Sequence, residues 1–286
     1  MERSITMLEE INLTGDPDEG KKFINWREAL ILPTDNIPEP IPILSIVQEG
    51  YHIPILNEDN ISLLFGPAKA RKSALVRSIC QAIFNGSNDK MVSNYHRKKI
   101  SIVDTEQSRH HCLRATKNIY QIAFQKHIVD YLSVTTYSKE DKKNLVESYL
   151  AESPDCGLMI IDNIVHFAND FNSATEAAEL TQWLLKIKST FNTHVLVVLH
   201  ENPTPENAFN SKPRGHLGTN LMNLCETGLR IRKDPNDKTR SIISAALTRG
   251  RDFTDIVLTM DDQMIPYLDD LEDDYEETKT KPKSYH

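Results

Sequence analysis

The sequence is poor in cysteine and in long apolar runs, and each shortage excludes a class of protein. The four cysteines are scattered along 286 residues and include no C-x-x-C pair. This excludes a disulfide scaffold and the usual zinc spacings, so we expect reduced thiols in a cytoplasmic protein. The longest apolar runs, of about five or six residues, are too short to span a membrane. The first residues also lack the apolar segment of a signal peptide.

Positive charge is in deficit as well. Lys and Arg number 33 against 41 Asp and Glu, which gives a net charge of −8. The whole chain is therefore not a nucleic-acid binder by bulk electrostatics. Much of the acid lies in residues 261–277, and the body without them is close to neutral. We expect residues 263–286 to form an acidic, disordered tail, whereas local basic patches remain compatible with the body.

Glycine is sparse, at 10 residues, yet one glycine opens the motif around which the chain is organised. Residues 61–66 have the pattern of a short buried strand, a loop opens at Gly66, and a helix is expected to begin near Arg71. The spacing Gly66-x-x-x-x-Arg71-Lys72-Ser73 is that of a phosphate-binding P-loop at every position but one. The exception is Arg71, which replaces the second glycine.

A loop of this kind wraps its N–H groups around the β- and γ-phosphates, and the helix start adds its positive dipole end. Lys72 contacts the phosphates and Ser73 ligates Mg²⁺. Alone, the motif also fits an ordinary strand-turn-helix with a basic cap. Arg71 points either outward as a cap on the helix start, or inward to a phosphate or a neighbouring chain. The expected nucleotide-binding residues are Gly66, Pro67, Ala68, Lys69, Ala70, Arg71, Lys72, Ser73 and Ala74.

Strand and helix patterns alternate after the loop, which is typical of an α/β fold with a doubly wound, mostly parallel sheet. Further strands are expected at residues 99–104, 127–134, 157–162 and 194–200, and helices at 107–125, 139–152, around 180–187 and near 217–224. Three antiparallel strands follow at about 226–233, 240–248 and 254–260. Residues 1–60 show little regular pattern and several prolines. We expect the run 41–47 to pack as an arm, which serves either packing alone or oligomerisation.

Polar residues stand at the ends of the central strands: the P-loop, then Asp104 with Glu106, then Asp162, and then His200. Ligands bind beyond the carboxyl ends of strands in open α/β sheets. A P-loop ATPase needs a phosphate cradle, an acid that organises Mg²⁺, a base for water and a γ-phosphate sensor. Asp162 suits the Mg²⁺ role, Glu106 the base, and His200 the sensor or a water-positioning group. Each acid alone also fits a solvated strand end.

This order of residues resembles the RecA-like P-loop ATPases, and among them the hexameric RepA-type and DnaB-type helicases. Segments 104–108, 198–202 and 214–219 look like an AAA-family ATPase subgroup encoded on bacterial mobile elements, whose loops often lack the second glycine. The resemblance covers about residues 42–260. It implies a RecA-like domain at 42–262, preceded by an arm at 1–41. It also implies ATP and Mg²⁺ as ligands, and a homo-oligomeric ring such as a hexamer.

The resemblance further implies an arginine donated to the nucleotide by a neighbouring subunit. Arg249 and Arg251 are the candidates, on the loop after the strand pattern at 242–247. The family often has Lys-x-Arg here, and the lysine is absent, so the assignment between the two stays open. Two exposed arginines at a hairpin are the alternative.

Single-stranded DNA is the implied partner, with no membrane, and the loop 203–216 is its expected contact. The loop offers Lys212, Arg214 and His216, with Phe209 as a stacking group. It also fits a plain surface loop, and Arg214 fits a contact to a neighbour's nucleotide. The acidic tail either competes with DNA for a basic channel or confers solubility.

These implications favour an ATP-hydrolysing ring motor that acts on DNA in replication or transfer of a mobile element. An ATP-controlled assembly or regulatory switch that recruits a protein partner is the alternative, favoured by the near-neutral body and the few cations of the loop. A third is a nucleotide binder that hydrolyses ATP slowly or not at all. Arg71 keeps it open, because it puts a side chain where the backbone must approach phosphate closely.

Overall fold

The computed structural model describes residues 26–122, 128–202 and 212–271. The chain separates into two units, Met1–Glu39 and Pro40–His286. The first contains the 3₁₀ helix η1 (Trp26–Ala29). The second contains the sheets and the candidate site.

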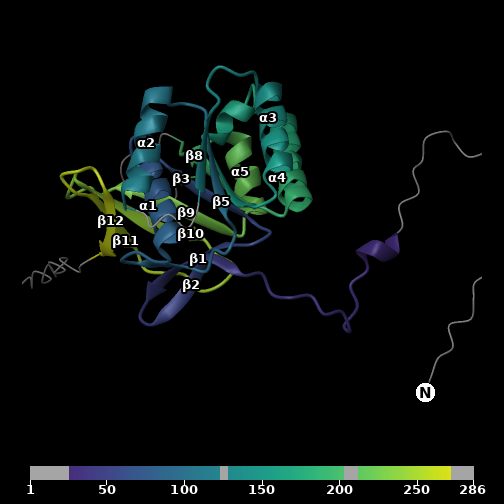
Figure 1. Cartoon of the computed structure of the whole chain (residues 1–286), viewed down its shortest axis with the longest axis horizontal. Helices are drawn as coiled ribbons and strands as arrows, with labels where there is room; N and C mark the ends of the chain where they lie inside the picture. The colour runs from purple at the N-terminus through teal and green to yellow at the C-terminus, as the bar shows by residue number, and fades with distance from the viewer. Residues whose placement is uncertain (1–25, 123–127, 203–211, 272–286) are drawn as a thin grey trace, which may run out of the picture. The chain divides into compact units, whose positions relative to one another are not determined.

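A nine-stranded sheet forms the centre of the second unit, in the order β12-β11-β10-β9-β3-β8-β7-β5-β6 (Figure 1). The six strands from β9 to β6 are parallel, and β10, β11 and β12 are antiparallel additions beside β9. The α/β fold with a mostly parallel sheet is thus confirmed. The strands are β3 (Ile61–Gly66), β5 (Lys99–Asp104), β6 (Ile128–Ser133), β7 (Cys156–Asp162), β8 (His194–His200), β9 (Thr227–Lys233), β10 (Arg240–Leu247), β11 (Ile256–Met260) and β12 (Pro266–Asp270).

The central strands are continuous apolar runs because both faces of the sheet are covered. Every residue of β3 and β7 is buried. The parallel register brings the strand ends level with one another. Gly66 is opposite His200, and Asp104 is opposite Asp162. The polar residues that end these strands therefore meet at one edge of the sheet.

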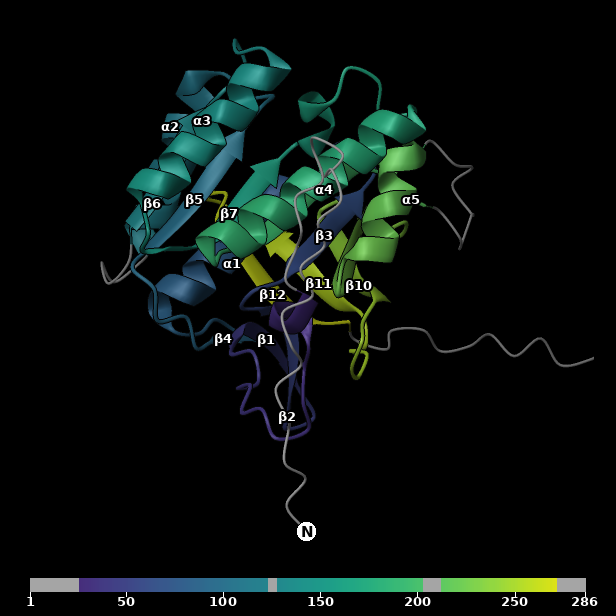
Figure 2. The same cartoon turned by 90° about the vertical axis from the view of Figure 1, so that its right-hand side faces the viewer.

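Two helical layers enclose the sheet (Figures 1 and 2). α1 (Lys72–Asn85) and α2 (Arg109–Ile122) lie on one face, and α3 (Lys139–Glu152), α4 (Ala174–Phe191) and α5 (Gly215–Leu224) lie on the other. Each layer has its own apolar core. The stripe at helical spacing on α4, from Leu180 to Ile187, is buried, as its period predicts.

The lack of regular structure expected from the pattern of residues 1–60 is wrong for residues 42–57, which include the run 41–47 expected to pack as an arm. They form a hairpin of β1 (Pro42–Gln48) and β2 (Tyr51–Asn57), which β4 (Met91–Ser93) extends to a three-stranded sheet. Prolines are compatible with these strands for positional reasons. Pro42 is the first residue of β1, and Pro54 lies on β2, which is an edge strand.

The prediction of a disordered tail is wrong at its start, because residues 266–270 form β12. Pro266 and Leu268 are buried whereas Tyr267, Asp269 and Asp270 are exposed, which is the alternation of an edge strand. Acidic side chains on the open face of an edge strand suppress pairing with other chains. β9 pairs antiparallel with β10, as expected, and it also pairs in parallel with β3, which joins the antiparallel strands to the parallel sheet. Residues 272–286 lie outside the described part of the chain.

All four cysteines lie in the described ranges, and they are buried and unpaired, as predicted. Within the same ranges, no helix combines the length and the apolarity that crossing a bilayer requires.

Candidate nucleotide-binding site

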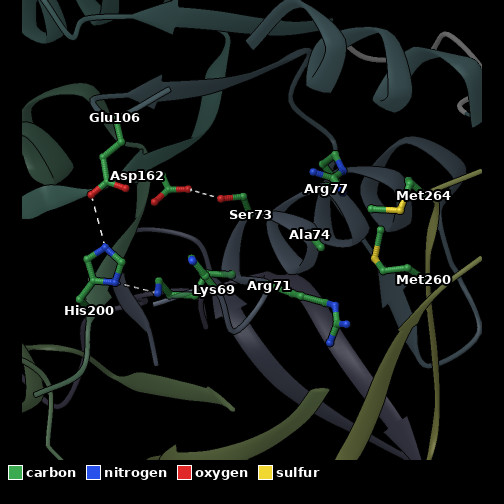
Figure 3. Close-up of a pocket in the computed structure, with 11 residues that line it drawn as sticks. Lys69, Arg71, Ser73, Ala74, Arg77, Glu106, Asp162, His200, Met260 and Met264 are labelled. Carbon is green, nitrogen blue, oxygen red and sulfur yellow. Dashed lines mark hydrogen bonds and ion pairs between the residues drawn. The ribbon is translucent and has the colours of Figure 1, made fainter. Parts of the chain in front are cut away.

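A pocket of about 300 Å³ lies at the carboxyl ends of β3, β5, β7 and β8 (Figure 3). It brings together five of the residues for which the sequence predicts chemistry: Lys72, Ser73, Glu106, Asp162 and His200. Its wall is completed by Lys69, Arg71, Ala74, Arg77, Met260 and Met264.

The P-loop leaves β3 through a glycine that has no room for a side chain. A Cβ on Gly66 would lie 2.0 Å from the carbonyl oxygen of Ile231 on β9. Beyond it the backbone enters the left-handed region twice, at Lys69 (φ 62°) and at Arg71 (φ 71°). Glycine takes this conformation without steric cost, and Arg71 holds it where the P-loop pattern expects glycine.

Helix α1 begins without a side-chain cap. Its N-cap residue is Arg71, whose side chain accepts no bond from the first turn. The first N–H groups of a helix lack intrahelical acceptors. The start of α1 therefore presents backbone donors and the positive dipole end to the pocket, which is the usual arrangement for binding phosphate.

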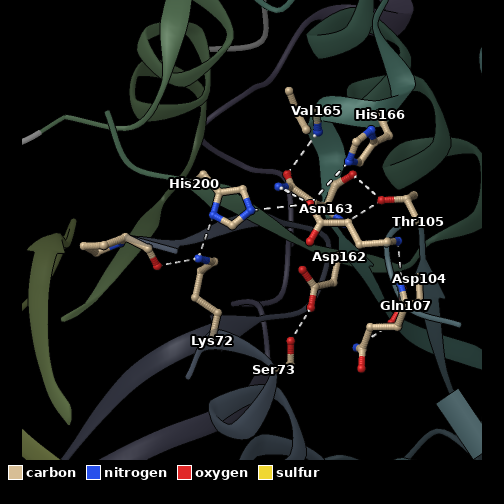
Figure 4. A network of polar contacts seen from close by, with 12 residues as sticks. Lys72, Ser73, Asp104, Thr105, Gln107, Asp162, Asn163, Val165, His166 and His200 are labelled. Carbon is tan, nitrogen blue, oxygen red and sulfur yellow. Dashed lines mark hydrogen bonds and ion pairs between the residues drawn. The ribbon is translucent and has the colours of Figure 1, made fainter. Parts of the chain in front are cut away.

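Lys72 folds back over the loop in this structure (Figure 4). Its Nζ donates to the carbonyls of Gly66 (3.0 Å) and Pro67 (2.9 Å), and it lies 3.0 Å from Nδ1 of His200. Burial lowers the pKa of Lys72, while the carboxylates of Asp162 and Glu106 oppose this shift. An anion in the pocket would compete with these neutral acceptors and offset the cost of burial.

Ser73 and Asp162 place two oxygen ligands side by side. The Ser73 hydroxyl donates to Oδ2 of Asp162 at 2.8 Å. Burial raises the pKa of Asp162 to about 6, partly opposed by the Ser73 hydrogen bond. The pair fits Mg²⁺, which binds oxygen and commonly takes one or two carboxylates together with substrate phosphates. A cation there would also stabilise the ionised form of a carboxylate that burial disfavours.

Glu106 is held through a single oxygen. Its Oε1 lies 3.1 Å from Nδ2 of Asn163, 3.3 Å from Nε2 of His166 and 3.4 Å from Nε2 of His200. Hydrogen bonds from His166 and then His200 hold the pKa of Glu106 well below its usual range. Among the described residues, Oε2 has no hydrogen-bond partner, so this oxygen can accept a proton or orient a water molecule.

The contacts of His200 define its tautomer. Lys72 can only donate, so Nδ1 of His200 accepts, and the ring proton is on Nε2. Nε2 faces Oε1 of Glu106. The imidazole of His200 thus links Lys72 of the P-loop to the carboxylate of Glu106, which follows β5.

Asp104, the other acid of the same strand end, has a different task. It is buried, and its carboxylate accepts from the N–H groups of Glu106 (3.0 Å) and Gln107 (2.7 Å). It also accepts from the Gln107 amide and from the Tyr131 hydroxyl, at 2.7 and 2.9 Å. Local bonds of this type close a turn. Asp104 therefore shapes the turn that presents Glu106.

Asn163 and His166 are the site residues that sequence reasoning missed. Asn163 directly follows the predicted acid of β7, and its backbone N–H donates to the Thr105 hydroxyl at 2.9 Å. His166 lies on the 3₁₀ helix η2 (Ile164–Phe167). The polar residue next to Asp162 was a usable signal. His166 carried none, because its approach to Glu106 depends on η2.

Arg71 lies in the wall of the pocket, but its guanidinium is bonded to residues 238–241. Nη1 donates to the carbonyl of Arg240 (3.1 Å) and to the Ser241 hydroxyl (2.8 Å), and Nη2 donates to the carbonyl of Lys238 (2.9 Å). Figure 3 shows the guanidinium pointing away from His200 and Glu106. Of the two orientations expected for Arg71, the outward one describes this arrangement: Arg71 is the N-cap residue of α1, although its side chain makes no capping hydrogen bond.

The arginines considered for a role in trans are not part of the pocket. Because β10 runs antiparallel to β9, its end at Leu247 lies at the opposite end of the sheet from the P-loop. Arg249 is exposed and lies 4.0 Å from a carboxylate oxygen of Glu226. Arg251 lies over the Tyr51 ring, 3.8 Å from its centroid. Neither can reach the nucleotide of its own chain.

The candidate DNA contacts follow β8 at the same edge as the pocket. Lys212, Arg214 and His216 are all exposed. The Arg214 guanidinium lies 4.5 Å from the centroid of the Phe171 ring, and its backbone N–H donates to the carbonyl of His200 at 3.0 Å. The rest of the loop, including Phe209, lies outside the described residues.

Comparisons with known proteins agree with this fold. Among solved structures, the RadB recombinase matches with a TM-score of 0.52 at 16% identity, over 76% of this chain and 93% of that chain. The ATPase domain of G40P matches with a TM-score of 0.51 at 9% identity, over 71% of this chain and 81% of that chain. At these identities the matches establish the RecA-like fold alone.

A comparison with curated proteins gives no significant match. A family model described as an AAA domain matches residues 27–205. This match spans more than half of the 286 residues and contains the P-loop, Glu106, Asp162 and His200. The chain belongs to this AAA domain family.

Proposed function

We propose that this protein binds and hydrolyses ATP with Mg²⁺, and that it works as a ring-forming motor on DNA in the replication or transfer of a mobile element. The observation that carries the hydrolytic part is the convergence of Lys72, Ser73, Glu106, Asp162 and His200 on one pocket. These residues come from four strand ends and supply every component that P-loop phosphoryl transfer to water requires.

Each side chain has a defined task in this proposal. The N–H groups at the start of α1 and the ammonium of Lys72 hold the β- and γ-phosphates. Ser73 and Asp162 hold Mg²⁺, which neutralises charge on the phosphates. Lys72 exchanges the carbonyls of Gly66 and Pro67 for phosphate oxygens when nucleotide binds.

Glu106 receives the proton of the attacking water. Its free oxygen, Oε2, orients the water, while Oε1 stays anchored to Asn163 and the two histidines. The low pKa of Glu106 keeps it ionised at neutral pH, so it is ready to accept a hydrogen bond from water. His200 lies between Lys72 and Glu106, where it can sense the γ-phosphate that Lys72 binds.

The test is the steady-state ATPase rate of Glu106→Gln, together with nucleotide binding. We expect the rate to fall by about 10²- to 10⁴-fold, the usual contribution of a general base, with ATP affinity preserved. Glu179→Gln, an exposed glutamate on α4, is the matched control and should hydrolyse ATP as the wild type does. Unchanged hydrolysis in Glu106→Gln would remove the base assignment.

The proposed action on DNA rests on a few polar side chains after β8, and it has a separate test. Three exposed polar side chains, Lys212, Arg214 and His216, follow β8, and the backbone of Arg214 is bonded to that of His200. Single-stranded DNA should stimulate ATP hydrolysis, and the stimulation should fade as salt rises. If single-stranded DNA does not change the ATPase rate at any salt concentration, the result favours the alternative, an ATP-controlled switch that recruits a protein partner.

The ring is tested by mass measurement with a non-hydrolysable ATP analogue. Arg249 and Arg251 lie far from their own pocket, so a role in hydrolysis requires a second subunit. We expect an oligomer, and loss of hydrolysis without loss of binding when the acting arginine becomes alanine. A monomer that still hydrolyses ATP would end the trans-arginine mechanism.

A further inference from the structure

Arg71 combines two features that a P-loop does not require. Its backbone adopts the left-handed conformation, φ 71° and ψ 30°, which is unfavourable for an arginine and nearly free of cost for glycine. Its guanidinium points away from His200 and Glu106 (Figure 3) and makes three hydrogen bonds with residues 238–241. An arginine therefore occupies a glycine conformation, and something must hold it there.

The three acceptors form a compact anchor at the turn between β9 and β10. Two are backbone carbonyls, of Lys238 and Arg240, and the third is the hydroxyl of Ser241, which is fully buried. Hydrogen bonds to a charged donor are stronger than neutral ones. None of the ion pairs in the described part of the chain involves Arg71, so these neutral acceptors are its partners.

The anchor is close in space to the phosphate cradle and remote in sequence. Arg71 is the N-cap of α1, so its position sets where the first N–H groups of the helix point. Its side chain ties that position to a turn about 170 residues later, with separations of 167 to 170. Movement of the turn would therefore move the cradle.

We propose that Arg71 is a positioning residue that holds the P-loop in its phosphate-binding conformation by anchoring it to the β9–β10 turn. The side-chain tether replaces the conformational freedom that a second glycine supplies. This inference rests on the proposed function, because it concerns the same phosphate site. The competing explanation is a guanidinium that swings inward and binds phosphate directly.

Substitution by glycine and by alanine separates the two explanations. Both changes remove the guanidinium, but only glycine takes the left-handed backbone freely. If Arg71 positions the loop, Arg71→Gly binds ATP within about threefold of the wild type. In Arg71→Ala the left-handed backbone is unfavourable and no side-chain hydrogen bonds hold it, so this variant binds ATP roughly 5- to 30-fold more weakly than the wild type. If the guanidinium binds phosphate, Arg71→Gly also binds ATP much more weakly than the wild type, because it lacks the cation.

Ser241→Ala probes the anchor without touching the loop. Loss of one hydrogen bond should raise the Kd for ATP by about threefold in the wild type and leave it unchanged in Arg71→Gly. Arg71→Lys retains a cation but cannot reach three acceptors at once, so it should not restore full affinity. An equal effect of Ser241→Ala in both backgrounds would overturn the tether.

Amide hydrogen exchange of residues 66–75 in the nucleotide-free protein separates this inference from the proposed function. Arg71→Ala and Ser241→Ala should exchange faster in this segment than the wild type. Unchanged exchange in both variants would refute the positioning role, whatever the protein binds. If the wild type binds no ATP, and the two variants still exchange faster than it does, the proposed function is refuted and the positioning role of Arg71 stands.

Discussion

His194 provides the most quantitative prediction, because it is a buried histidine in the middle of the sheet. It begins β8, the strand that ends at His200, and it is fully buried. Its Nδ1 lies 2.6 Å from the carbonyl oxygen of Asn57 on β2, while Nε2 has no partner in the described part of the chain. Burial lowers the pKa of His194 from its ordinary 6.5 to about 4.

The sign of the effect follows from which state binds the proton. The unfolded chain protonates His194 near pH 6.5, whereas the folded protein keeps it neutral down to about pH 4. As pH falls below 6.5, the unfolded state binds more protons and the free energy of unfolding decreases. With these two pKa values the loss is about 2 kcal/mol at pH 5 and about 3 kcal/mol at pH 4. Above pH 6.5, His194 contributes no pH dependence.

Urea unfolding of the wild type and of His194→Phe, at pH 7.5 and at pH 5, measures this contribution. Phenylalanine keeps a ring but cannot be protonated, and its lost hydrogen bond to Asn57 lowers stability equally at both pH values. The decrease in unfolding free energy between the two pH values should be smaller in the variant by about 2 kcal/mol. His52→Asn, an exposed histidine on β2, is the control and should keep the wild-type pH dependence. Equal pH dependence in wild type and His194→Phe would refute the argument from burial.

Three further predictions concern the site. Asp162→Asn should stabilise the nucleotide-free protein at pH 7 by up to about 3 kcal/mol, because the folded state holds an ionised carboxyl whose pKa is raised from 3.8 to about 6. The same change should abolish Mg²⁺-dependent nucleotide binding. Urea unfolding without Mg²⁺ measures the first effect, which an unchanged stability would contradict, and nucleotide titration with Mg²⁺ measures the second. His166→Gln should raise the pKa of Glu106, so the acid limb of the kcat profile for ATP hydrolysis should move to higher pH, whereas His110→Gln, on the exposed side of α2, should leave it in place. Tyr131→Phe should cost about 1 kcal/mol of stability and lower kcat more than it raises KM, because Asp104 then orders the Glu106 turn less well; a change in KM alone would contradict this.

The sequence was sufficient for the central architecture because its signals are local. A buried parallel strand needs a continuous apolar run, and β7 and β8 are such runs. A helix packed on one face needs an apolar stripe, and α4 has one. Since parallel strands end at the same edge, the polar residues that follow them could be assigned to one site before any contact was known.

Edge strands were harder to predict because they need less apolar sequence. β12 was assigned to an acidic tail, since only Pro266 and Leu268 of its five residues face the core. β1 and β2 contain prolines, which argue against strands in the middle of a sheet but not at strand starts and edges. Pairing with a neighbour decides these segments, and composition does not report it.

The division of labour between Asp104 and Glu106 depends on contacts that no local pattern contains. Two residues apart at the end of one strand, Asp104 and Glu106 cannot be told apart by chemical type in the sequence. Tyr131 from β6 and the Gln107 amide saturate Asp104, whereas Asn163 and two histidines hold only one oxygen of Glu106. The carboxylate with an unsatisfied oxygen is the one that can act on water.

The role of Arg71 also depends on contacts that a local sequence pattern does not contain. As a sequence feature it is a defect in a P-loop, because a side chain stands where the backbone should approach phosphate. In the structure its backbone adopts the left-handed conformation that glycine favours, and its guanidinium is bonded to acceptors that lie about 170 residues later in the chain. The positioning role proposed for Arg71 therefore makes this departure from the motif compatible with phosphate binding through contacts to the start of β10. A search for P-loops that lack the second glycine should require a tether of this kind as well as the spacing.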